Sequence, residues 1–172
     1  MNRTLKNVVV CSLASVFAAT AVAATATWWH GQTQFSRNQR IVTAAIAENG
    51  MVTGETCKNW ARRIVNQASR NEVTIPATAA NNYQWLPSPD VYAPQMCLPI
   101  QNAAVGSVIQ MLYTQSNGTT QPHTAILKSR TSTGMEWIDC NWVAAGKVGV
   151  HSMSYPQFYA GVGNRYTVYA VR

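Results

Sequence analysis

The spacing of the apolar residues changes once along this chain, at about Val105. Before that point they recur every third or fourth residue, as in GETCKNWARRIVNQASR, which is the spacing of an amphipathic helix. After it, short runs rich in β-branched and aromatic residues alternate with turns such as Asn117-Gly118, which is typical of antiparallel strands. This order predicts an α+β fold in which N-terminal helices pack on one face of an antiparallel β-sheet.

Two helices can be placed from their boundary residues. A Ser-x-x-Gln capping box at 36–39 predicts the start of the first helix, which ends near Gly50. Thr53 or Thr56 marks the start of the second, so Cys57 lies in its first turn. The strands expected after these helices are VGSVIQMLY, HTAILKS, GMEWIDCNW and RYTVYAV. Residues 74–102, which hold five of the seven prolines, are predicted to form a long surface loop.

The first residues predict export. Arg3 and Lys6 precede an uncharged run from Val8 to Ala23 that ends in Ala-Val-Ala, the pattern of a secretory signal peptide. We expect cleavage after Ala23, with Ala26 as the second choice and an uncleaved anchor as the alternative. Cleavage leaves a periplasmic or secreted protein without a membrane segment. Residues 24–172 are then long enough for one domain, with its core at about 36–172.

Three cysteines remain after cleavage, in a compartment where paired thiols oxidise. Because the count is odd, at least one thiol stays free. Cys97 and Cys140 are expected to form a disulfide, or to remain as two buried thiols. Cys57 differs from both because the first turn of a helix offers unpaired N–H groups and the positive end of the helix dipole, which favour a thiolate nucleophile.

A base and a residue to orient it follow on the predicted strands. His123 opens one strand, whereas His30 lies in the N-terminal tail and His151 in a later connection. In WIDCNW the two-residue period of a strand places Asp139 and Asn141 on the face opposite Cys140. If the two strands pair, a carboxylate and an amide lie beside the imidazole and fix its tautomer.

The order of these segments resembles a known family. TCKNWARRIV, AAVGSVIQML, HTAIL and DCNW together resemble a CHAP domain, the cysteine- and histidine-dependent amidohydrolase/peptidase related to NlpC-type hydrolases and more distantly to papain. The resemblance runs from about Ser36 to Arg172. It implies a papain-like α+β fold with Cys57 as nucleophile, His123 as base, Asp139 as the residue that orients His123, and Asn141 as an auxiliary polar group.

The resemblance also implies a substrate, the amide bonds of peptidoglycan, either between N-acetylmuramic acid and L-Ala or within the stem peptide. Two alternatives stay open: a cysteine hydrolase or deamidase that acts on proteins as a secreted toxin, and a non-catalytic cell-wall-binding protein with this fold. The sequence does not determine the oligomeric state.

Charge and motifs exclude several other classes of function. The net charge of +7 falls to +5 without Arg3 and Lys6, which favours an anionic partner. The basic residues are scattered rather than clustered, so nucleic acid is not an expected partner. The sequence has no Gly-rich phosphate loop, Cys-x-x-Cys pair or His-x-x-x-His spacing, and we expect no cofactor or metal.

Overall fold

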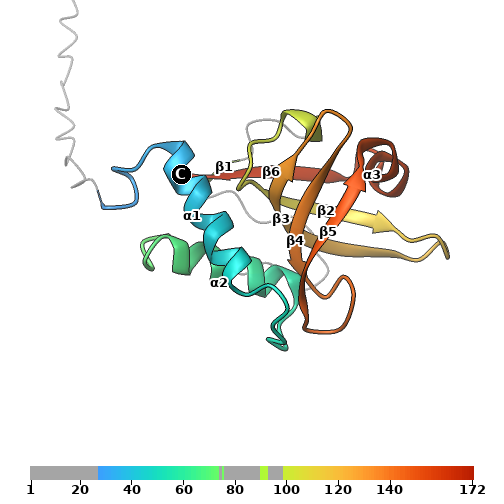
Figure 1. Ribbon diagram of the computed structural model, residues 1–172, viewed down its shortest axis with the longest axis horizontal. Coiled ribbons are helices and arrows are strands. Elements are labelled where there is room, and N and C mark those ends of the chain that lie inside the picture. The colour runs from blue at the N-terminus through green and yellow to red at the C-terminus, as the bar shows by residue number, and fades with distance from the viewer. Residues whose placement is uncertain (1–26, 74, 76–89, 93–98) are drawn as a thin grey trace, which may run out of the picture.

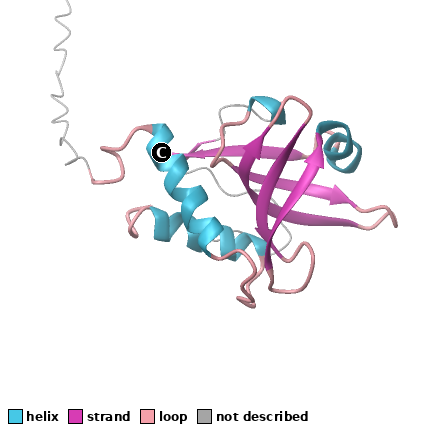
Figure 2. Cartoon of the chain, viewed as in Figure 1, coloured by secondary structure: helices cyan, strands magenta, loops and turns pink. Residues whose placement is uncertain are grey.

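The computed structural model describes residues 27–73, 75, 90–92 and 99–172. The predicted signal peptide and most of the proline-rich segment lie outside the described residues. The described chain is an α+β fold, as the sequence predicts: three α-helices pack against an antiparallel sheet with the strand order β1-β6-β2-β3-β4-β5 (Figures 1 and 2). None of the helices in these ranges is long and apolar enough to cross a membrane.

The first two helices begin at threonine N-caps. Helix α1 spans Gln34–Ala47, and the side chain of Thr33 accepts a hydrogen bond from the N–H of Ser36. The cap is therefore three residues earlier than the expected Ser36. Helix α2 spans Cys57–Ala68, and Thr56 accepts from the N–H of Asn59 in the same way.

Most of the sheet is a meander of four consecutive strands. These are β2 (Val108–Thr114), β3 (Thr120–Arg130), β4 (Gly134–Cys140) and β5 (Val148–Ser154). The last strand, β6 (Tyr166–Val171), pairs with the opposite edge of β2, and the short β1 (Val91–Tyr92) pairs with β6. A 3-10 turn, Ile100–Asn102, leads into the meander.

Each face of the sheet has its own hydrophobic core. On one face, α1 and α2 pack Ile41, Trp60 and Ile64 against Val108, Ile126 and Ile138. On the other, α3 (Tyr155–Val162) packs Phe158 and Val162 against Leu127 and Trp137. In Figure 1, α3 lies at the end of the sheet away from α1. Helices therefore cover both faces, not only the one expected.

β5 and α3 occupy the segment that the sequence predicted as a connection. Two signals for them were present. Val148 and Val150 alternate with Gly149 and His151, and Ser154 forms a capping box with Gln157 at the start of α3. His151 therefore lies on a central part of β5, next to β4, rather than in a loop.

Candidate active site

Cys57 is the first residue of α2, directly after the Thr56 N-cap. The first N–H groups of a helix have no partner within the helix. The N–H of Lys58 is one of them, and it hydrogen-bonds the Cys57 sulfur. The thiol is partly buried, and the backbone N–H of Thr124 also hydrogen-bonds it. Cys57 therefore combines access from solvent with donors that stabilise a thiolate.

The strand register explains why Thr124 is available to Cys57. The pairing of β3 with β4 ends at Ala125 and Asp139, so Thr124 is the next residue toward the start of β3. At this point β4 stops at Cys140, and Asn141 takes a positive φ of 76° that turns the chain away. The start of α2 lies beside this end of β4 (Figure 1).

His123 and Asp139 project from the same face of the sheet, because Ala125 is directly opposite Asp139 and His123 is two residues from Ala125. Nε2 of His123 lies 3.2 Å from Oδ2 of Asp139. The Asp139 carboxylate is fully buried, and His123 is only 7% exposed. A buried carboxylate at this distance fixes the imidazole ring and leaves Nδ1 as the nitrogen that can face Cys57.

The electrostatics favour a thiolate and an imidazolium. Burial raises the pKa of the Cys57 thiol, but the contact with His123 and the two backbone N–H donors lower it below its ordinary value. Burial lowers the pKa of His123, but Asp139 and Cys57 raise it to about 9. Each group of the pair thus stabilises the charged form of the other. The structure brings together Cys57, His123 and Asp139, as the sequence predicted.

Asn141 does not share the face of Asp139. The expected alternation fails because the strand ends one residue earlier, at Cys140. Nδ2 of Asn141 donates a 2.8 Å hydrogen bond to the carbonyl oxygen of Glu55, and Oδ1 accepts from the N–H of Gly146. Asn141 thus ties the segment before Cys57 to the end of β4, while also lining the pocket beside His123.

The expected disulfide between Cys97 and Cys140 is not formed, because Cys140 is a free thiol. Cys97 itself lies outside the described residues. Cys140 is a buried free thiol that donates to the carbonyl oxygen of Glu55 at 3.3 Å. It faces the core beneath α2, as predicted from its position opposite Asp139. Burial raises the pKa of the Cys140 thiol, so of these two thiols only Cys57 has a lowered pKa.

His151 is a member of the cluster that the sequence analysis missed. Its Nε2 lies 3.5 Å from Oδ1 of Asp139, so the carboxylate lies between two imidazoles. The alternation of Val148, Gly149, Val150 and His151 was the signal that could have placed it on a strand.

Trp142 covers the imidazole of His123. Their ring centroids are 4.9 Å apart, and Tyr113 meets Trp142 edge-on with a centroid distance of 4.7 Å. A cavity of about 40 Å³ remains beside His123, lined also by Gln115, Gln121 and Pro122. Aromatic cover lowers the local dielectric, which strengthens the interaction between His123 and Asp139.

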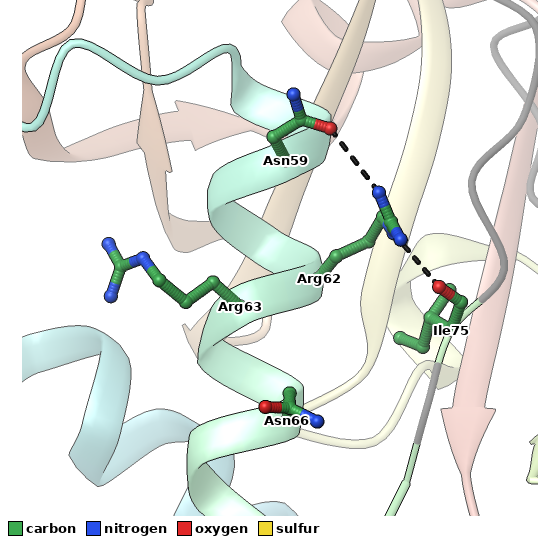
Figure 3. A pocket seen from close by; sticks show the side chains of 5 residues that line it. All are labelled: Asn59, Arg62, Arg63, Asn66 and Ile75. Carbon is green, nitrogen blue, oxygen red and sulfur yellow. Dashed lines mark hydrogen bonds between the residues drawn. The ribbon is translucent and has the colours of Figure 1, made fainter. Parts of the chain in front are cut away.

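A larger pocket, of about 250 Å³, lies on the outer side of α2 (Figure 3). Arg62 crosses it and donates to the carbonyl oxygen of Ile75 and to Oδ1 of Asn59. Helical spacing turns Asn59 and Arg62 away from the core-facing side of α2, so this pocket is separate from the thiol of Cys57. The part of the chain that the structure describes contains no cluster arranged to hold a metal ion.

Comparison with known proteins identifies a similar fold. No protein-family model matches the chain, and no curated protein matches it by sequence. The crystal structure of Ly7917 with the hydrolyzing product of MDP has a TM-score of 0.51 at 13% identity, covering 81% of this chain and 63% of that chain. A second crystal structure of Ly7917 has a TM-score of 0.48 at 12% identity, covering 78% and 62%. This chain thus spans less than two thirds of Ly7917, and the likeness is one of fold.

Proposed function

We propose that this protein is an exported cysteine amidase or endopeptidase that hydrolyses amide bonds of peptidoglycan through a thioester intermediate. The observation that carries the proposal is the contact between Cys57 and His123, with the pKa of the thiol lowered and that of the imidazole raised to about 9. A thiolate beside an imidazolium supplies both a nucleophile and an acid at neutral pH.

In the first half of the reaction, the Cys57 thiolate attacks the carbonyl carbon of the amide. The oxygen of the tetrahedral intermediate carries the negative charge, and the N–H of Cys57, the first residue of α2, donates a hydrogen bond to it in the proposed reaction. His123 gives its proton to the leaving nitrogen, the C–N bond breaks, and an amine departs. The product is a thioester on Cys57 and a neutral His123.

In the second half, His123 takes a proton from water, and the resulting hydroxide attacks the thioester carbonyl. The C–S bond breaks and the carboxylic acid is released. The thiolate and the imidazolium are then restored, so the balance is one amide and one water converted to one acid and one amine. Asp139 stays ionised and holds the ring of His123 throughout.

The substrate class is supported by two observations of different kinds. The fold is similar to that of Ly7917, whose crystal structure contains the hydrolyzing product of MDP, a peptidoglycan fragment. The N-terminal segment has the pattern of a signal peptide, which would deliver the enzyme to the compartment that holds the cell wall. We propose the stem peptide or its link to N-acetylmuramic acid as the site of cleavage.

Digestion of purified peptidoglycan tests the proposal, with soluble products identified by mass spectrometry. The wild-type chain should release new amine and carboxyl ends, and the product masses identify the bond. Cys57→Ala should release none. His30→Ala, which changes an exposed histidine outside the site, is the matched control and should behave as wild type.

A casein-like protein incubated in parallel distinguishes the alternatives. Cleavage or deamidation of that protein with intact peptidoglycan would identify a protein-directed enzyme and overturn the proposed substrate. Inactivity toward both, together with a Cys57 that reacts no faster than a peptide thiol, would identify a binding protein and overturn the enzymatic proposal.

A further inference from the structure

Asp139 has two imidazole neighbours, of which the proposed reaction uses only one. His123 on β3 approaches Oδ2 at 3.2 Å, and His151 on β5 approaches Oδ1 at 3.5 Å. Asp139 is fully buried, and the His151 side chain is 13% exposed. Among the described residues, Nε2 of His151 and both oxygens of Asp139 are buried, and none of them makes a hydrogen bond of normal geometry. The carboxylate is the polar group that faces this nitrogen.

The backbone of β5 leaves room for this approach. Asp139 pairs directly with Gly149, and Trp137 pairs with His151. The imidazole of His151 must therefore lean along its strand across Gly149 to reach Asp139. A methyl group on Gly149 would lie 3.3 Å from Nε2 of His151, in the path of the ring. A side chain at Gly149 would thus crowd the imidazole of His151 where it approaches Asp139.

We infer that His151 is a positioning residue that acts through Asp139, donating its Nε2 proton to Oδ1 so that Oδ2 stays directed at His123. The inference deepens the proposed function and rests on it only for the effect on turnover.

A buried carboxylate with only one fixed oxygen can rotate about its Cβ–Cγ bond, and the imidazole bound to it moves with it. Holding both oxygens removes that rotation. The titratable groups around Asp139 agree with this role. Burial raises the pKa of Asp139, but the contacts with His123 and then His151 lower it below its ordinary value. Without His151, the carboxylate should take up a proton at higher pH, and His123 should then lose its anionic partner.

The test uses the full chain with four substitutions. His151→Leu removes the donor, and His151→Gln keeps an N–H at nearly the same distance from the backbone. Gly149→Ala crowds the imidazole without changing it. Ser152→Ala is the control, because Ser152 lies on the same strand and contacts Glu136 rather than Asp139.

Two measurements are made on each variant: kcat and KM for peptidoglycan fragments, and the rate of iodoacetamide alkylation of Cys57 against pH, measured by mass spectrometry of the peptide that contains it. His151→Leu should lower kcat by about tenfold with little change in KM, and should move the acid limb of the alkylation profile to higher pH. His151→Gln should restore both, Gly149→Ala should show a smaller change in the same direction, and Ser152→Ala should match wild type.

An unchanged alkylation profile in His151→Leu would overturn the inference. So would a His151→Gln variant as impaired as His151→Leu, since that result indicates packing rather than hydrogen bonding. The alkylation profile needs no substrate. If the wild-type chain leaves peptidoglycan intact while His151→Leu still shifts the profile and His151→Gln restores it, the proposed substrate fails and the role of His151 stands.

Discussion

Asn141 holds Glu55 in place, and through it Cys57, two residues later. The 2.8 Å hydrogen bond from Nδ2 of Asn141 to the carbonyl oxygen of Glu55 joins residues that are 86 positions apart in the chain. Cys140 donates to the same carbonyl oxygen. The end of β4, which also carries Asp139, is therefore attached directly to the start of α2. One short segment thus sets the distance between the carboxylate and the thiol.

Asn141→Ala should reduce both stability and activity. The substitution leaves the carbonyl oxygen of Glu55 with one donor fewer and the N–H of Gly146 without its acceptor, which should lower the free energy of unfolding by about 1–3 kcal/mol. Urea denaturation of the variant and the wild type measures this difference. A catalytic defect with unchanged stability would contradict the positioning role and favour direct contact with the substrate.

Cys57→Ala and His123→Ala should each reduce turnover by about a thousandfold or more while the fold persists. The reason is that neither side chain belongs to the hydrophobic cores on the two faces of the sheet. Peptidoglycan digestion measures the loss, and thermal melting measures the fold. A non-cooperative melt in either variant would instead indicate a structural role.

Asp139→Asn should be less damaging than loss of Cys57 or His123, with turnover reduced by about 10- to 100-fold. The amide keeps the size of the side chain but removes the charge that raises the pKa of His123. The alkaline limit of activity should therefore fall below pH 9. Steady-state kinetics across the pH range would check both effects, and an unchanged alkaline limit would show that Asp139 does not set the pKa of His123.

The pH dependence of kcat/KM in the wild type should be bell-shaped. Activity should be lost toward acid as the Cys57 thiolate takes up a proton, at a pH below the ordinary value for a thiol because its pKa is lowered. Activity should be lost toward alkali through about pH 9, where His123 loses the proton that it gives to the leaving amine. Alkylation of Cys57 alone should follow the acid limb, and an acid limb at the pKa of a free thiol would disprove the ion pair.

Addition of EDTA should leave activity unchanged, because every proposed step uses the thiol of Cys57 and the imidazole of His123. The check is a digestion with and without chelator, with zinc and calcium added back in turn. Loss of activity with EDTA and recovery with one metal would overturn the mechanism.

The sequence was sufficient to predict those helices and strands whose formation depends mainly on neighbouring residues. Thr53 or Thr56 and the apolar spacing after them predict α2 and place Cys57 in its first turn, since capping and amphipathicity involve neighbouring residues; the structure selects Thr56 as the cap. The alternation in β3 and β4 likewise predicts two strands carrying His123 and Asp139, and the structure pairs them. The segment after Lys147 was harder because its strand contains Gly149 and two serines, which weaken the apolar alternation.

The sequence by itself determined the α+β class, the helix that carries Cys57, and the strands that carry His123 and Asp139. Only the tertiary structure decided which groups meet. The register that places His151 against Asp139, and the turn at Asn141 that reaches Glu55, depend on contacts between distant segments. Such contacts are set by packing of the whole sheet and its helices, and no short window of sequence contains both partners.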